Sequence, residues 1–95
     1  MTPHRLTLAY RGEDFFGWQR QDPHPTVQLA LEQALQKIYG RKIPVAASGR
    51  TDRGVHALGQ VASCELPTLH SPHTLTKALN FHLPPGARVL SIRQE

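Results

Sequence analysis

The residue best suited to covalent chemistry is an aspartate between two arginines. Asp52 lies in the glycine-containing segment Gly49–Gly59, with Arg50 two residues before it and Arg53 directly after it. Positive charges this close favour the ionised carboxylate, which can act as a nucleophile or a base, and the glycines allow a sharp turn and the close approach of a ligand. An aspartate that caps a turn and pairs with a surface arginine has the same pattern, and spacing alone does not separate the two interpretations.

Two long connections must place the residues that could form a site. The segment 49–59 lies between predicted strands at 43–48 and 60–66, and it is longer than a tight hairpin requires. The segment 11–25 mixes glycine, proline, charge and aromatic residues, a composition that fits neither a helix nor a strand. Loops of this length are usually functional.

The remaining pattern predicts an alternation of strands and helices. Residues 5–10 alternate apolar and polar side chains, as a half-buried strand does. Thr26 can cap a helix whose apolar residues share one face, and Gly40 can end it. A second helix begins at Ser71 and Pro72, and residues 87–93 form a last strand whose inward face is ambiguous because Val89 breaks the alternation.

The resulting order is β-α-β-β-α-β. This order matches the ferredoxin-like split βαβ motif, an α+β fold with an antiparallel sheet and both helices on one face. The fold hosts many unrelated functions, so it implies no activity without a site.

Composition describes one basic domain. The chain has 95 residues, eleven Lys and Arg against seven Asp and Glu, and a net charge of +4. This charge fits a polyanion binder, and equally a merely soluble basic protein. The single cysteine, Cys64, cannot form an internal disulfide, and the lack of a signal sequence or a long apolar run predicts a cytoplasmic protein with no membrane association. His70 and His73 have no suitably spaced third ligand, so we expect no metal site.

The segment around Asp52 resembles a known active-site motif. Its sequence, Gly49-Arg50-Thr51-Asp52 followed by Gly54-Val55-His56-Ala57 and Gly59-Gln60-Val61, is similar to that of the tRNA pseudouridine synthase A family. Three further blocks resemble the same family in the same order: the first-loop signature within 10–21, the first helix within 26–35, and the end of the second helix at 80–84. Four ordered blocks are far more specific than one short motif.

The resemblance implies an isomerase that needs no cofactor. Asp52 would be the nucleophile while uracil is cut from C1′ of a uridine in the tRNA anticodon stem-loop, rotated, and rejoined through C5. Three roles of Asp52 remain open: attack on the uracil at C6, attack on the ribose at C1′, and action as a general base in a route through a glycal. Arg50 would pair with Asp52 and help to hold a flipped-out uridine, because chemistry on a stacked base requires its extrusion.

Five further residues are candidate substrate contacts. Arg53 is either a phosphate contact or a solvated charge, and His56 occupies a position that is structural or RNA-contacting in the family. Arg11 and Arg20 are candidate phosphate contacts, with a solvated surface charge as the alternative for each. Gln19 belongs to the first-loop signature and completes the predicted set.

The resemblance also predicts that residues 1–95 are an N-terminal catalytic half with the second half absent. The family chain is about twice this length, and its two similar halves face each other across an RNA-binding cleft and associate as homodimers. The expected partners are therefore tRNA, the missing C-terminal half and a second copy of the full-length parent. We expect the isolated chain to be inactive. A non-catalytic RNA-binding module of the same fold is the alternative, although binding alone needs no acid that faces a polyanion.

Overall fold

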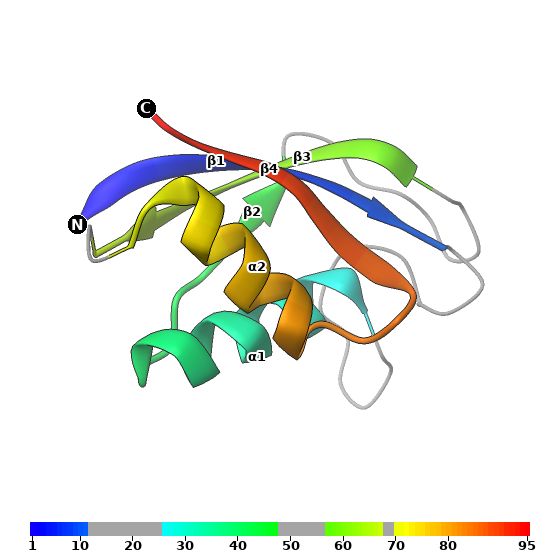
Figure 1. Cartoon of the computed structure of the whole chain (residues 1–95), viewed down its shortest axis with the longest axis horizontal. Coiled ribbons are helices and arrows are strands. Elements are labelled where there is room, and N and C mark those ends of the chain that lie inside the picture. The colour runs from blue at the N-terminus through cyan, green and yellow to red at the C-terminus, as the bar shows by residue number, and fades with distance from the viewer. Residues whose placement is uncertain (12–25, 48–56, 68–69) are drawn as a thin grey trace.

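The computed structural model describes residues 1–11, 26–47, 57–67 and 70–95, which form a four-stranded sheet with two helices against one face (Figure 1). The elements in chain order are β1 Thr2–Tyr10, α1 Val27–Tyr39, β2 Ala46–Ala47, β3 Ala57–Leu66, α2 Pro72–His82 and β4 Ala87–Gln94. The strands lie in the order β2-β3-β1-β4, and each pair of neighbours is antiparallel. The predicted ferredoxin-like α+β architecture is confirmed.

The central strand β1 follows the predicted alternation. Leu6, Leu8 and Tyr10 are buried on the face that the helices cover, whereas Arg5 is exposed on the opposite face. The strand begins earlier than predicted, at Thr2, and the added residues continue the same alternation because His4 is also buried. The uncovered face, which we call the open face, therefore carries the odd-numbered residues of β1.

The first helix begins and ends as predicted. The Thr26 hydroxyl accepts a hydrogen bond from the Leu29 N–H at 3.3 Å, which satisfies one of the unpaired donors of the first turn. Gly40 adopts a φ of 73°, and its N–H donates to the Gln36 carbonyl at 2.8 Å. This left-handed conformation suits a residue without a Cβ.

The second helix fixes β4 through one side chain. It begins after Ser71, whose hydroxyl accepts from the Thr74 N–H at 3.2 Å. Further along, the Asn80 amide donates to the Val89 carbonyl at 3.0 Å, and its oxygen accepts from the Val89 N–H at 2.7 Å. One side chain thus holds both backbone polar groups of a residue in an outer strand.

A register shift explains the broken alternation of β4. Thr7 pairs with Ser91, but Leu8 pairs with Val89, so Leu90 is an extra residue in β4. Val89 is thereby buried with the residues on the helix side, and Leu90 is exposed. The sequence left this face ambiguous because a single inserted residue reverses the parity of everything beyond it.

The strand predicted at 43–48 is shorter in the structure, where β2 contains Ala46–Ala47 alone and Ser48 lies outside the described residues. Two side chains of α1 form hydrogen bonds with the backbone of Val45. The Val45 N–H donates to Glu32 Oε2 at 3.0 Å, and the Val45 carbonyl accepts from Gln28 Nε2 at 2.8 Å. Pro44 has no N–H to donate. The segment before β2 is therefore tied to the helix rather than to a neighbouring strand.

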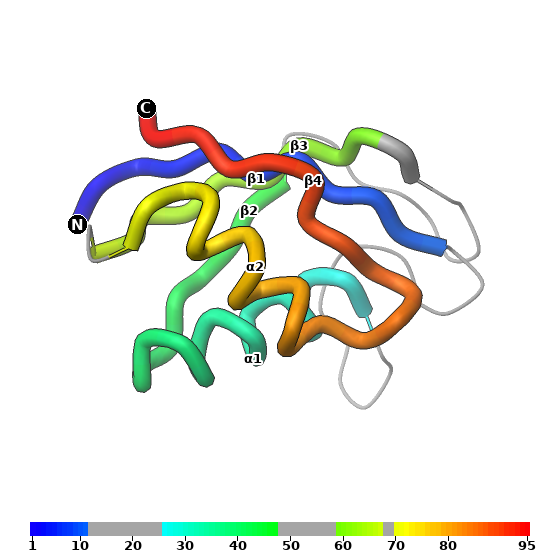
Figure 2. Tube along the Cα trace, viewed as in Figure 1, coloured from blue at the N-terminus to red at the C-terminus, as the bar shows by residue number. Residues whose placement is uncertain are grey.

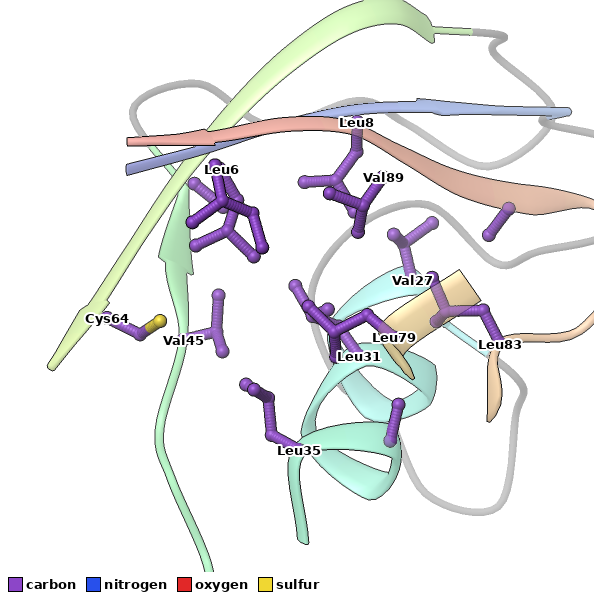
Figure 3. Packing of buried hydrophobic residues seen from close by; sticks show 14 of the residues in the cluster. Leu6, Leu8, Val27, Leu31, Leu35, Val45, Cys64, Leu79, Leu83 and Val89 are labelled. Carbon is purple, nitrogen blue, oxygen red and sulfur yellow. The ribbon is translucent and has the colours of Figure 1, made fainter. Parts of the chain in front are cut away.

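Leucine and valine side chains from the sheet and both helices meet in one core (Figure 3). Leu6 and Leu8 of β1 point toward Leu31 of α1 and Leu79 of α2, and all four residues are fully buried. Cys64 joins this core from β3. The core leaves the open face free to carry polar residues.

Candidate active site

Most of the predicted site residues lie in segments that the structure does not describe. Arg11 is within the described residues; those outside them are Gln19, Arg20, Arg50, Asp52, Arg53 and His56. The structure therefore defines the strand ends to which the two long connections attach.

One end of the sheet holds the attachment points. Tyr10, the last residue of β1, pairs with Ala57, the first residue of β3. Figure 2 shows this end opposite the end where the two chain termini lie. Residues 12–25 follow β1 closely in sequence, and residues 48–56 directly precede β3. The fold thus brings together the strand ends to which the two segments with the predicted site residues attach.

The start of β3 is earlier than the sequence indicated. The strand was expected at 60–66, but Ala57–Gly59 already belong to it. Ala47 at the end of β2 pairs with Ala62, whereas Ala57 lies five positions before Ala62, roughly 17 Å along an extended strand. The connection between β2 and β3 accordingly starts beside the middle of β3 and ends at its tip.

Tyr10 and Gln60 link β1 and β3 at this end. The buried Tyr10 hydroxyl donates to Gln60 Oε1 at 3.5 Å, a long contact, and Gln60 Nε2 donates to the Val61 carbonyl at 3.2 Å. Gln60 was quoted in the motif but was given no role by the sequence. Gln60 follows directly after the segment 49–59 and links β3 to β1 through Tyr10.

Arg11 is held by its backbone and is exposed. Its N–H donates to the Gly86 carbonyl at 2.9 Å, which extends the pairing of β1 with β4 beyond Tyr10. The arginine is thereby placed at the same end of the sheet as the start of β3. This position suits the phosphate contact predicted for Arg11.

Sequence analysis missed another arginine at this end. Arg88 in β4 pairs with Ala9 and is exposed on the open face. The signal was its alternation with the buried residues Ala87 and Val89. The ambiguity of the β4 face concealed that signal.

The one described cysteine lies away from this end and is unsuited to nucleophilic chemistry. Cys64 pairs with His4, near the start of β1, and is 7% exposed. Burial raises the pKa of its thiol to about 12, so the thiol stays protonated at neutral pH. Burial also raises the pKa of Tyr39, with a smaller contribution from Cys64. Neither group provides an alternative reactive centre.

Two hollows of the described surface lie on the helix side. One of about 220 Å³ runs between α1 and the segment 42–44, and one of about 290 Å³ lies along α1 near Pro84. Neither contains a residue from the predicted site. Within the described ranges no three His, Cys, Asp or Glu residues gather as metal ligands would, and no helix is long and apolar enough to cross a membrane.

Comparison with known proteins places this scaffold in a family. A family model described as tRNA pseudouridine synthase matches residues 7–94. The chain belongs to the tRNA pseudouridine synthase family. It is 54% identical to tRNA pseudouridine synthase A of Methylacidiphilum infernorum over 95% of this chain, and 52% identical to that of Rhodospirillum rubrum over 90%. A third relative, from Roseobacter denitrificans, is 51% identical over 90% of this chain.

The match to the tRNA pseudouridine synthase family covers all of the predicted site but only part of the relatives' length. Residues 7–94 include every predicted site residue, from Arg11 to His56. The chain covers 35% of the Methylacidiphilum protein, 33% of the Roseobacter protein and 31% of the Rhodospirillum protein, and it matches their N-terminal part. The chain thus spans about one third of the length of these relatives.

Proposed function

We propose that this chain is the N-terminal catalytic part of a tRNA pseudouridine synthase A. The observation that carries the proposal is the family match over residues 7–94, which includes the Gly49–Gln60 motif. The fold supports it because Tyr10 pairs with Ala57, which brings together the end of β1 and the start of β3, where the two segments with the motifs attach. The full-length protein would act on uridines of the tRNA anticodon stem-loop, as a cytoplasmic homodimer.

Asp52 supplies the carboxylate on which the isomerisation depends. The N1–C1′ glycosidic bond breaks, a C5–C1′ bond forms, the C5 hydrogen leaves as a proton, and N1 gains a proton. Asp52 acts as the nucleophile in this exchange, and four residues separate it from β3, so the covalent chain tethers the carboxylate to the sheet. Arg50 pairs with Asp52 and holds the extruded uridine.

The remaining predicted contacts bind the RNA around that uridine. Arg53 and His56 follow Asp52 closely in sequence, whereas Gln19 and Arg20 belong to the first-loop segment. Arg11 begins the same segment and is exposed at the end of β1. A set that contains three arginines gives binding energy through phosphate neutralisation, which is salt-dependent.

The isolated chain lacks about two thirds of the relatives' length, so turnover belongs to the full-length protein. Loss of the groups on the other side of a cleft removes positioning and electrostatic stabilisation, each worth several kcal/mol of barrier. We therefore expect no turnover by the 95-residue chain alone.

Release of tritium from C5-labelled tRNA tests the proposal, because C5 loses its hydrogen when the new bond forms. The full-length protein is expected to release tritium and to leave pseudouridine in the tRNA, while the 95-residue chain alone releases none. Full-length protein that binds tRNA without any release would support the non-catalytic RNA-binding module instead. Release by the chain alone would show that residues 1–95 contain everything that the reaction requires.

A further inference from the structure

The basic residues of the described chain divide by type between its two sides. Those of the open face and of the end of β1 are all arginines: Arg5, Arg11, Arg88 and Arg93. Those of the helices and of the turn after α1 are mostly lysines: Lys37, Arg41, Lys42 and Lys77. Arginine has a planar fork that matches phosphate oxygens, whereas lysine is a strongly hydrated point charge. The open face thus carries the basic residue type that phosphate recognition favours.

Two of these arginines are neighbours at the end where the site segments attach. Arg88 pairs with Ala9, and the bond from the Arg11 N–H to the Gly86 carbonyl continues the same ladder. Arg11 and Arg88 are therefore diagonal neighbours on adjacent strands, and the Cα atoms of such neighbours are about 7–8 Å apart. Both are exposed.

The acidic residues of the open face lie at the other end. Glu65 pairs with Pro3, and the Glu95 N–H donates to the Pro3 carbonyl. The carboxylate of Glu95 also binds Arg5 at 3.0 Å, which offsets charge in the distant pair formed by Arg5 and Arg93. Among the described residues, the end that holds Arg88 has no such acid on the open face.

The surface beside Arg88 is low and open. Its cross-strand neighbour is Ala9, and Gly59 of β3 has no atom within 4 Å of the position that a Cβ would occupy. No described residue of the open face is aromatic, although protein-binding surfaces are enriched in aromatic residues. The small side chains of Ala9 and Gly59 leave room for an RNA backbone to reach the two arginines.

We propose that Arg11 and Arg88 form a phosphate-binding pair that holds successive phosphodiester groups of an RNA strand at the end of the sheet where β3 begins. The proposal rests on the proposed function for the identity of the RNA, and it adds a contact from β4 to the predicted site. Arg88 is the sharper probe of the pair, because its paired residue and strand neighbours are all described.

The test measures tRNA affinity of the full-length protein from 50 to 200 mM salt, for the wild type, Arg88→Ala and Lys77→Ala. Lys77 is the matched control because it is an exposed cation on the helix side. The logarithm of the association constant K falls linearly as the logarithm of the salt concentration rises. Loss of one phosphate contact makes this slope shallower by about 0.7–0.9. Arg88→Ala should therefore bind tRNA about 5–10-fold more weakly than the wild type at 50 mM salt. The ratio of the two affinities should fall about threefold between 50 and 200 mM.

The double variant Arg11→Ala, Arg88→Ala should lower the slope by about twice that amount if each arginine holds its own phosphate. Lys77→Ala should leave the slope unchanged. An Arg88→Ala slope equal to that of the wild type would overturn the proposal. So would a lower thermal midpoint of the full-length protein with unchanged salt dependence, because that result would assign Arg88 to docking of the rest of the chain.

The binding assay does not depend on turnover, so its failure is separable from failure of the proposed function. Wild-type protein that releases no tritium while Arg88→Ala still lowers the salt slope would refute the synthase and retain the phosphate pair. The opposite combination, tritium release with an unchanged slope, would refute the phosphate pair and retain the synthase.

Discussion

Asn80 holds β4 to the rest of the domain, and its removal should lower stability by a calculable amount. Its side chain donates to the Val89 carbonyl at 3.0 Å and accepts from the Val89 N–H at 2.7 Å, and Val89 is 1% exposed. Asn80→Ala removes two hydrogen bonds, each worth about 1 kcal/mol net, and leaves a buried N–H unsatisfied. We therefore expect a loss of about 2–3 kcal/mol in the free energy of unfolding.

Urea denaturation of the 95-residue chain, followed by circular dichroism, measures this change. For a domain of this size, a loss of 2 kcal/mol lowers the thermal midpoint by roughly 8–16 °C. Asn80→Asp should cost about as much, because it retains the acceptor but sets a charged oxygen against the Val89 carbonyl. Thr76→Ala is the control within the same helix: its hydroxyl donates to the Pro72 carbonyl at 2.8 Å on the exposed side, and its loss should cost less than about 0.5 kcal/mol.

A second readout connects the same contact to the RNA-binding proposal. Arg88 is the neighbour of Val89, so a loosened β4 should also weaken tRNA binding by the full-length protein. If Asn80→Ala unfolds at the same urea concentration as Thr76→Ala, the two hydrogen bonds do not stabilise the fold and the reasoning is refuted.

Three further outcomes are expected. Thr26→Ala removes the cap of α1 and should cost about 1–2 kcal/mol in urea denaturation, whereas a loss below 0.3 kcal/mol would argue against the cap. Burial raises the pKa of the Cys64 thiol from 9.0 to about 12, so the free energy of unfolding should keep its full value below pH 9 and fall as pH rises toward 12. Cys64→Ala should reduce this fall in unfolding curves measured at pH 8 and 10.5, and an unchanged fall would contradict the expectation. In the full-length protein Arg50→Lys should lower tritium release far more than Arg53→Ala, because Arg50 requires its planar fork; equal losses would show that the two roles are misassigned.

Local signals were sufficient to predict most of the fold. Thr26 and Gly40 delimit α1 through cap chemistry that acts within one helical turn, and Pro72 marks the start of α2 in the same way. The alternation around Leu6 and Leu8 identified the buried face of β1, because that period depends on backbone geometry alone.

Elements that depend on distant partners were predicted less well. β2 is short because the side chains of Glu32 and Gln28, which lie in another part of the sequence, form hydrogen bonds with the backbone of Val45. The β4 face depends on the extra residue Leu90, whose effect appears only when β4 is paired with β1. No local pattern contains either fact.

The candidate site was predicted from the motif rather than from geometry. The resemblance supplied Asp52 and Arg50, and both lie outside the described residues, so their roles stay predictions. Arg11 is in a position that fits its predicted role, at the end of β1. Arg88 could be found only from the register, because its closeness to Arg11 arises from the pairing of strands that are far apart in the sequence.

The most direct test of the central claim compares Asp52→Asn with Glu65→Gln in the full-length protein. Each variant converts one carboxylate to an amide, and Glu65 is an exposed residue at the far end of β3. Asp52→Asn should lower pseudouridine formation by about 10³-fold or more while tRNA affinity stays equal or rises, because an amide cannot act as nucleophile or base and a negative charge facing the RNA is lost. Glu65→Gln should keep wild-type activity. Asp52→Asn activity within about tenfold of the wild type would contradict the assignment of Asp52 as the catalytic carboxylate.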